Sequence, residues 1–382
     1  MNTPMEGRWP MRYPDDAVSI NWVSDDDSLA STVARWPDVI ALDTEFLRTD
    51  TFYPKPGLYQ IATPGHVDLI DPLAITAWGP FSAYLQNPAT VKIMHACMED
   101  LEVFHHHLGV VGENIFDTQL AQAFISPDYS LSYQGLVAAH LDIHLDKHET
   151  RSDWLARPLS EAQVAYAVED VVYLLQLYDG LVAQLREHGR WEWFQADMHE
   201  RARYALPDPQ VYYQNVKKAW RLQPQQLATL QALCAWREET ARATDIPRNR
   251  VVWDDHLMEF ATQRELRINH VNNALPRRIA KRFAEQLLAV HTDAQQLPAP
   301  PSLPRPLNSQ QGAMLKLLRE AARGVAHELQ FAPELLARKR EVEQCLRHYL
   351  HHGELSTAFQ AWRGGLVGDQ FRAILEAGPQ SV

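Results

Sequence analysis

The chain has 382 residues, 46% of them hydrophobic and 22% charged, and a formal net charge of −12. This composition is typical of a soluble globular protein, and the length exceeds one ordinary core and predicts two or three domains. There is no run of about 18 uncharged apolar residues and no apolar signal stretch at the N-terminus, which disfavours a membrane-spanning or secreted protein and predicts a cytoplasmic location.

The three cysteines, Cys97, Cys234 and Cys345, are isolated and odd in number. None belongs to a CxxC spacing, so the sequence indicates neither a disulfide framework nor a zinc ribbon. Because free cysteines are among the most often buried residues, we predict buried, reduced thiols.

The charge is distributed unevenly along the chain. Residues 1–205 contain 13 Lys and Arg against 30 Asp and Glu, a net of −17, whereas residues 206–382 carry a net of +5. An acidic N-terminal half suits cation binding and a basic C-terminal half suits a polyanion, although two solvated surfaces of opposite sign would give the same count.

Apolar, β-branched runs that predict strands cluster in the first hundred residues, at 18–23, 39–46, 58–63, 67–71 and 91–96. Stretches that predict helices lie between and after them, at 28–36, 81–87, 99–108, 118–125 and 160–189. Early strands followed by increasing helix predict an α/β domain with a mixed central sheet. The close succession of the second, third and fourth strands predicts a meander.

From about residue 212 the pattern is wholly helical, as at 225–244 and 277–291. The proline-rich stretch 297–307 cannot continue a helix and predicts a semi-rigid linker. Further helices are predicted after it, at 311–329, 333–350 and 369–378. The C-terminal half is therefore predicted to contain two small helical domains.

Three acids fall at the ends of predicted elements in the acidic half. Asp43 and Glu45 are separated by one residue in a strand, so the alternation of side chains projects both to the same side. Asp100 comes shortly after the strand 91–96, near the start of a helix, where free N–H groups favour anions.

A fourth acid lies on the helix predicted at 160–189. Ser160 is placed to cap this helix, and an apolar periodic run follows it. Tyr166 and Asp170 are four residues apart and therefore share one face. The phenol and the carboxylate are predicted to point into one site.

Four carboxylates brought together repel one another and lose hydration, a cost that bound divalent cations offset. Hard oxygen ligands select Mg²⁺ or Mn²⁺ over zinc. Two such ions about 4 Å apart would clamp the attacking and leaving oxygens of a phosphodiester. The acids therefore predict hydrolysis of a phosphodiester with two bound metal ions.

These motifs, taken in order, resemble a known nuclease family. DxE at 43–45, HxxxxDL at 95–101 and YxxxD at 166–170 are joined by TFYPKPGLYQIA after the first motif and TRSDWLARPLSEAQ before the third. The set resembles ribonuclease D, in the tyrosine subgroup of the DEDD exonuclease superfamily. The segment beginning AWRLQPQQLATL resembles a helicase-and-RNase-D C-terminal (HRDC) domain.

The resemblance covers the whole chain and implies its division. It implies an RNase H-like 3′–5′ exonuclease domain at 1–207, a first HRDC domain at 208–294, a proline-rich linker at 295–307 and a second, more divergent HRDC-like domain at 308–382. It also implies a hydrolase that removes 5′-mononucleotides from RNA 3′ ends, with tRNA precursors and other structured RNAs as substrates.

Residue by residue, Asp43, Glu45, Asp100 and Asp170 match the family's metal-ligand positions. Tyr166 matches the tyrosine that orients the attacking water. Because a phenol with a pKa near 10 is a poor base at neutral pH, Tyr166 is expected to position the water and not to deprotonate it.

Candidate substrate contacts flank these motifs, and each has a structural alternative. Phe46 would stack on the terminal base or belong to the core, and Gln60 would touch the nucleotide or fill a strand interior. His95 would approach the cleft or be a packed histidine. Arg151 and Arg157 would meet phosphates or belong to a solvated loop.

The basic clusters of the helical half predict phosphate contacts, with solvated helix faces as the alternative. The candidates are Lys217, Lys218, Arg248, Arg250, Arg277, Arg278, Lys281 and Arg282.

Two other functions stay open at this stage. A DNA-directed 3′–5′ exonuclease would share the same acids, since discrimination depends on contacts to the 2′-hydroxyl that no single residue proves. A nucleic-acid-binding protein without catalysis is the other alternative, although all four acids and Tyr166 are intact. No long heptad pattern occurs, and we predict a monomer.

Overall fold

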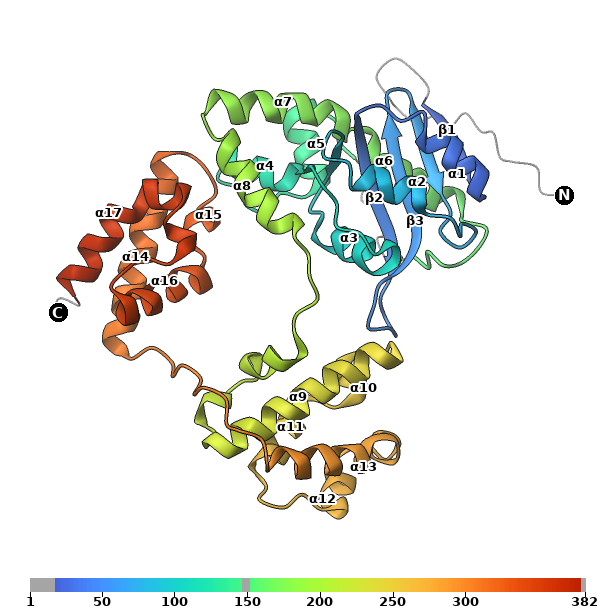
Figure 1. Cartoon of the computed structure of the whole chain (residues 1–382). Helices are drawn as coiled ribbons and strands as arrows, with labels where there is room; N and C mark the ends of the chain where they lie inside the picture. The colour runs from blue at the N-terminus through green and yellow to red at the C-terminus, as the bar shows by residue number, and fades with distance from the viewer. Residues whose placement is uncertain (1–17, 146–151, 379–382) are drawn as a thin grey trace. The chain divides into compact units, whose positions relative to one another are not determined.

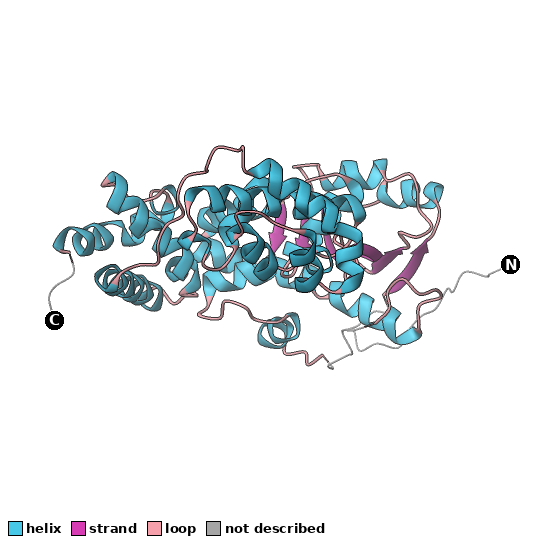
Figure 2. Ribbon diagram, turned by 90° about the horizontal axis from the view of Figure 1, so that it is seen from below, coloured by secondary structure: helices cyan, strands magenta, loops and turns pink. Residues whose placement is uncertain are grey.

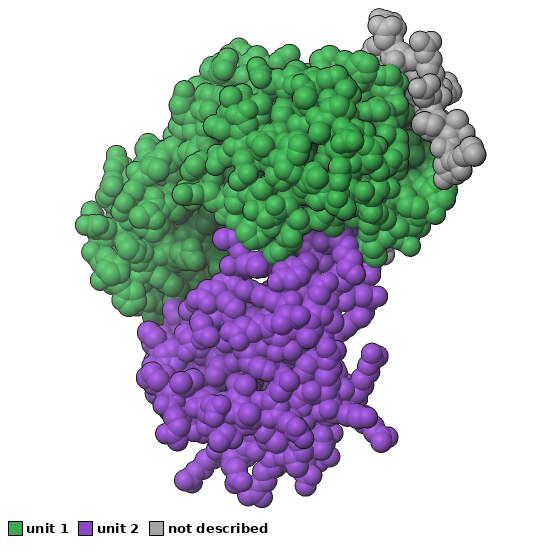
Figure 3. Space-filling model, turned by 45° about the vertical axis from the view of Figure 1, so that its right-hand side comes forward, with its two compact units in different colours: residues 1–47, 56–204, 307–382 green, residues 48–55, 205–306 purple. Residues whose placement is uncertain are grey.

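The computed structural model describes residues 18–145 and 152–378. The chain divides into two compact units (Figure 3). The first unit consists of residues 1–47, 56–204 and 307–382, and the second consists of residues 48–55 and 205–306. Each unit is built around its own hydrophobic cluster.

The first unit contains a six-stranded sheet (Figure 1). Its strands are β1 (Ser19–Val23), β2 (Val39–Leu47), β3 (Lys55–Thr63), β4 (His66–Ile70), β5 (Val91–Met94) and β6 (Ile115–Asp117). The spatial order is β1-β4-β3-β2-β5-β6. β1 pairs with β4, β2 with β5 and β5 with β6 in parallel, whereas β3 and β4 are antiparallel. The sheet is therefore mixed, as predicted.

The strands predicted at 39–46, 58–63 and 67–71 are neighbours in the sheet, which confirms the adjacency expected of a meander. Gly65 forms the tight β3–β4 connection with a φ of 77°, a left-handed conformation that glycine adopts without steric cost. The sequence missed β6, because a strand of three residues is too short to show a period.

Helices surround the sheet in the first unit (Figure 2). They are α1 (Asp26–Val33), α2 (Gly79–Leu85), α3 (Met98–Val103), the π-helical turn η1 (Phe104–Leu108), α4 (Thr118–Ile125), α5 (Tyr133–Leu141), α6 (Glu161–Val172), α7 (Leu174–Glu187) and α8 (Trp191–Ala202). The single helix predicted at 160–189 is two helices that meet at Tyr173. The helix α5 was not predicted.

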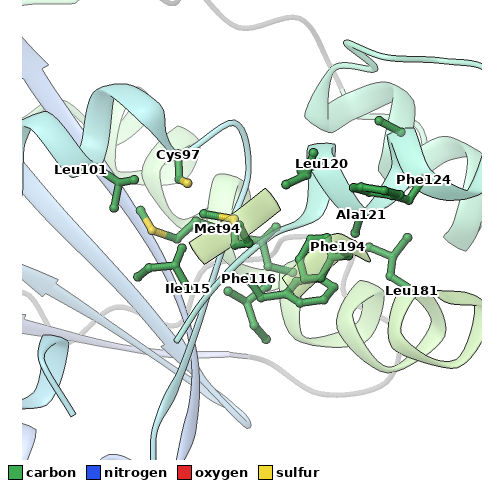
Figure 4. Packing of buried hydrophobic residues seen from close by; sticks show 14 of the residues in the cluster. Met94, Cys97, Leu101, Ile115, Phe116, Leu120, Ala121, Phe124, Leu181 and Phe194 are labelled. Atoms are coloured by element: carbon green, nitrogen blue, oxygen red, sulfur yellow. The ribbon is translucent and has the colours of Figure 1, made fainter. Parts of the chain in front are cut away.

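The core behind β5 and β6 is filled by large apolar side chains (Figure 4). Met94, Phe116, Phe124 and Phe194 are each at most 3% exposed. Cys97 lies in the same cluster as a free, buried thiol, and the other two cysteines are also free and buried, which confirms that prediction. This packing fixes β5 and the turn after it, from which α3 begins.

The C-terminal helices belong to the first unit and share its core. They are α14 (Ser309–Glu328), α15 (Glu334–Ala337), α16 (Lys339–His352), the 3₁₀ turn η4 (Thr357–Phe359) and α17 (Trp362–Ala377). The rings of Trp193 and Trp362 stack with centroids 5.3 Å apart, and the Ala332 amide donates to the Ala123 carbonyl. The last helices therefore pack directly on α4 and α8.

The regular structure of the second unit is helical, apart from the segment 48–55 and the stretch that follows α13. It contains η2 (Pro209–Asn215), η3 (Ala219–Arg221), α9 (Pro224–Thr244), α10 (Arg248–Val251), α11 (Asp254–Thr262), α12 (Ile268–Ala274) and α13 (Arg277–Ala294). Phe52 inserts into its core, and the backbone amides of Phe52 and Tyr53 donate to Asp245 at 3.0 Å each. The proline-rich stretch lies between α13 and α14 and is not helical, as predicted.

Within the described ranges, none of the helices combines the length and the apolar character needed to cross a bilayer.

Candidate active site

Strand β2 brings the first two acids to one place. Asp43 and Glu45 alternate with the buried Leu42 and Thr44 along the strand, so both carboxylates project to the same side. One oxygen of each, with one oxygen of Asp170, lies within 4.8 Å of the others. Among the described residues, this is the group of three or more potential ligands that is placed to hold a metal ion.

Helix α6 supplies Asp170 and Tyr166. Ser160 begins the helix: its hydroxyl accepts from the Gln163 amide, and the Gln163 side chain accepts in return from the Ser160 amide. This reciprocal cap sets where the helical register begins. Ala167, Val168 and Val171 bury the opposite side of the helix in the core, so Tyr166 and Asp170 are presented together.

Asp100 reaches the site from α3. Its carboxylate is 7% exposed and accepts a hydrogen bond from the hydroxyl of Thr44, the residue that separates Asp43 from Glu45 in the sequence of β2. The turn before α3 is fixed by Asp117, which accepts from the backbone amides of Ala96 and Cys97 at 3.0 and 3.3 Å. Asp100 is thus beside the three clustered carboxylates but bonded to a neutral hydroxyl.

The acids raise one another's affinity for protons. Burial raises the pKa of the Asp43 carboxyl well above its ordinary value, and the charges of Asp100, Asp170 and Glu45 add to this. Burial and the charges of Asp170 and Asp100 raise the pKa of Glu45 to about 9. Burial raises the pKa of Asp100 to about 7 against the opposing bond from Thr44. Without a cation, the cluster therefore retains protons at neutral pH.

Tyr166 stays a phenol in this environment. Burial raises the pKa of its hydroxyl above the ordinary value, and the charges of Asp170 and Glu45 and a hydrogen bond with Asp170 raise it further. A hydroxyl that keeps its proton can donate to one oxygen and accept from another, but it cannot act as a base at neutral pH.

Three of the candidate substrate contacts differ in their burial and in the partners of their side chains. Phe46 is half-buried and packs against the core cluster. Gln60 is fully buried in β3, and neither polar atom of its side chain has a hydrogen-bond partner among the described residues. His95 is half-buried: its Nδ1 lies 2.9 Å from the Thr118 hydroxyl, and its ring packs edge-on to that of Tyr133. As substrate contacts, all three stay predictions.

The guanidinium of Arg157 is fully hydrogen-bonded within the protein. Its five N–H donors meet five acceptors, which are both oxygens of the Asp71 carboxylate and the carbonyls of Trp154, Ala156 and Gly57. These bonds hold the loop before α6 against β3 and β4. Arg151, the other predicted phosphate contact, lies outside the described residues.

The same loop places an aromatic wall beside Tyr166. Trp154 is 4% exposed, and its ring centroid lies 6.1 Å from that of Tyr166. Gly57 is required for this approach, because a Cβ atom there would lie 2.6 Å from the Trp154 Cβ. Trp154 therefore limits the positions that the Tyr166 side chain can adopt.

Thr44, Asp117 and Trp154 were missed from the sequence as parts of the site. The apolar run after Asp117 in FDTQLAQAFI is a recognisable helix start, and it could have identified Asp117 as a cap. Thr44 and Trp154 had no such local signal, because their partners are distant in the sequence.

Comparison with known proteins supplies two family matches. A 3′–5′ exonuclease profile matches residues 20–186, the part of the chain that contains the four acids and Tyr166. An HRDC domain profile matches residues 226–290, within the second unit.

Curated relatives match almost the entire chain. Ribonuclease D of Pseudomonas paraeruginosa is 41% identical over 373 residues, which cover 94% of this chain and 99% of the relative. Ribonuclease D of Escherichia coli is 34% identical over 380 residues, which cover 95% and 100%. The crystal structure of the Escherichia coli protein, described as an exoribonuclease involved in structured RNA processing, superimposes with a TM-score of 0.87 at 33% identity and covers 94% of this chain and 100% of that one.

Proposed function

Because this chain belongs to the ribonuclease D family, we propose that it shortens RNA from the 3′ end and releases one 5′-mononucleotide per step. The chain is a hydrolase, a 3′–5′ exoribonuclease with an HRDC domain. The observation that carries the proposed chemistry is the convergence of Asp43, Glu45 and Asp170 within 4.8 Å, in the segment that matches the exonuclease profile.

The donor set fits divalent metal ions. All of the clustered groups are carboxylates, the ligands that Mg²⁺ and Mn²⁺ prefer, and the raised pKa values of Asp43 and Glu45 reflect negative charge that the protein itself leaves unbalanced. We assign Asp43, Glu45, Asp100 and Asp170 as the residues that would hold two such ions. When bound, these ions would supply the positive charge that acidifies a water and stabilises the leaving 3′ oxygen.

The remaining steps fall to the chain's own side chains. Tyr166, kept protonated by its surroundings, would hold the attacking water in line with the terminal phosphodiester. Asp170 would fix the orientation of the phenol, and Trp154 would limit the movement of its ring. Phe46, Gln60 and His95 stay the predicted contacts to the terminal nucleotide.

The proposed substrates are structured RNAs with unpaired 3′ ends, tRNA precursors among them. The support is the description of the Escherichia coli relative as an enzyme of structured RNA processing. We also propose that residues 1–207 form the exonuclease domain, 208–294 the first HRDC domain, 295–307 a linker and 308–382 a second HRDC-like domain. The monomeric state and the cytoplasmic location stay predictions.

A time course on matched single-stranded RNA and DNA tests this function. Both oligonucleotides have one sequence and a 5′ label, and products are identified by mass as 5′- or 3′-monophosphates. We expect the RNA to shorten in single-nucleotide steps with release of 5′-monophosphates. Equal rates on DNA would replace the proposal with a general 3′–5′ exonuclease, and binding without cleavage would replace it with a non-catalytic RNA-binding protein.

A further inference from the structure

The second unit contains a pocket whose lining is basic. Its volume is about 280 Å³, and it lies between the segment that follows β2 and the residues around α10. We call it the arginine pocket; it is lined by Arg48, Thr49, Thr51, Phe52, Pro247, Arg248, Asn249 and Arg250. Three of these residues are arginines and none is acidic, so the pocket favours an anion.

Arg248 is held in place before any ligand arrives. Its Nε donates to the Glu238 carboxylate at 2.6 Å, and its guanidinium lies over the ring of Phe52, 4.7 Å from the centroid. Its two Nη groups have no acceptor within the described part of the chain, and the side chain is 33% exposed. A guanidinium fixed on one edge with free donors on the other loses little entropy on meeting a phosphate.

Arg250 is engaged differently. Its Nη2 donates to the carboxylate of Asp50, and both side chains are well exposed, at 55% and 70%. An exposed ion pair of this kind is worth little, so a phosphate could replace the carboxylate at low cost. Asp50 thus neutralises Arg250, one of the arginines that line the pocket, until another anion takes its place.

We propose that the arginine pocket binds a backbone phosphate of the RNA chain, with Arg248 as the fixed donor and Arg250 exchanging Asp50 for that phosphate. The inference rests on the proposed function, because it takes RNA as the ligand. Chain connectivity supports it: Arg48 directly follows Leu47, the last residue of β2, the strand that contains Asp43 and Glu45. The RNA would then be held both at its 3′ end and at a phosphate further along the strand.

The two residues of the exposed pair give opposite predictions. In the full-length protein with Asp170→Asn to prevent digestion, binding of a labelled single-stranded RNA is measured by anisotropy from 50 to 300 mM salt. We expect Arg250→Ala to weaken binding about fivefold and to reduce the slope of log affinity against log salt by about 0.7, the value for one phosphate contact on a single strand. We expect Asp50→Asn to strengthen binding about twofold to threefold, because it removes the competing carboxylate.

The control variant is Arg267→Ala. Arg267 is also an exposed arginine of the second unit paired with an acid, Glu265 at 3.0 Å, but it does not line the pocket. The proposal is overturned if Arg250→Ala changes affinity and salt slope no more than Arg267→Ala, or if Asp50→Asn weakens binding.

Digestion of the same RNA by the protein with Asp170 intact separates this inference from the proposed function. If the protein with Asp170 intact digests the RNA but the Arg250 and Asp50 variants bind it with unaltered affinity, only the pocket proposal is refuted. If both variants bind with altered affinity in the predicted directions but the protein with Asp170 intact does not digest the RNA, the pocket proposal is supported and only the proposed exonuclease activity on that RNA is refuted.

Discussion

Arg157 and Asp71 form a two-point ion pair, with Nε 2.8 Å from Oδ2 and Nη2 2.6 Å from Oδ1. The pair fixes the loop that contains Trp154, whose ring lies 6.1 Å from that of Tyr166. The loop therefore connects an ion pair on β4's end to the phenol of the proposed site.

Arg157→Lys should slow catalysis without removing RNA binding. Lysine keeps the charge but cannot supply the planar set of five donors, so Trp154 loses its fixed position and Tyr166 its support. Misplacement of a positioning group by about 1 Å costs up to about 100-fold, and we expect kcat to fall about tenfold with KM nearly unchanged. Arg35→Lys, a change at an exposed helix-end arginine of the same unit, is the matched control. Equal kcat in both variants would contradict this role.

Tyr166→Phe should lower kcat about 10- to 100-fold and leave metal affinity almost unaltered, because the hydroxyl positions water and is not assigned as a ligand. The raised pKa of the phenol adds a pH signature. The rate of the unmodified enzyme should not rise with pH near pH 10 in a way that depends on Tyr166. A rise of that kind, lost in Tyr166→Phe, would identify the deprotonated phenol as a titrating base and contradict the positioning role.

The metal-free protein should lose stability as pH rises. The pKa values of Asp100 and Glu45 are raised to about 7 and about 9 in the folded state, so the folded protein binds protons more tightly than the unfolded chain. The resulting stabilisation is complete below about pH 4 and is lost as pH rises through those values.

Glu45→Gln should remove part of that loss. In urea unfolding with chelator at pH 6, 7.5 and 9, we expect the variant to be more stable than the parent at pH 9, by at least about 1 kcal/mol, and to show a smaller decline with pH. Added Mg²⁺ should stabilise the parent more than the variant. A parent protein whose stability rises from pH 6 to 9 without metal would contradict the electrostatic description of the site.

Metal binding should release protons at pH 7. Asp43 and Glu45 retain protons in the free site, and a ligating carboxylate must be ionised. Calorimetric titration with Mn²⁺ in two buffers of different ionisation enthalpy should show release on the order of one proton per bound ion, with affinity rising from pH 6 to 8. Identical heats in both buffers would rule out this linkage.

Arg363 and Asp197 should stabilise the first unit. The Nη atoms of Arg363 donate to both oxygens of Asp197 at 2.9 and 2.7 Å, and the Trp362 indole donates to the same carboxylate at 3.1 Å. The pair is nearly buried, so Arg363→Met leaves an unpaired charge and should cost about 3 kcal/mol in the free energy of unfolding. Asp197→Asn combined with Arg363→Met should cost less than the sum of the single changes. Additive losses would show that the two residues do not interact.

The local part of the site was predictable from the sequence because its signals are periodic. The two-residue spacing of Asp43 and Glu45 and the four-residue spacing of Tyr166 and Asp170 determine which side chains share a face once the strand and helix are recognised. The cap at Ser160 was visible for the same reason.

The contacts that complete the site were not predictable because they join distant residues. Thr44 and Asp100 are separated by 56 positions, and Arg157 and Asp71 by 86. A single sequence contains no signal for such pairs, so nothing in it indicated that Thr44 bonds to Asp100 or that Arg157 pairs with Asp71. The association of α17 with α8 through Asp197 and Arg363, 166 positions apart, was hidden in the same way.

The most direct test of the proposed active site is the shortening of one 5′-labelled RNA, followed on a denaturing gel with Mg²⁺ and with chelator. Three proteins are compared: the unmodified chain, Asp170→Asn, and Asp179→Asn, which changes an exposed acid on the neighbouring helix α7. We predict stepwise loss from the 3′ end only with Mg²⁺, at equal rates for the unmodified chain and Asp179→Asn, and a rate at least about 1000-fold lower for Asp170→Asn. Digestion by Asp170→Asn at the unmodified rate, or digestion by the unmodified chain in chelator, would contradict the assignment of these acids as a metal-dependent exonuclease site.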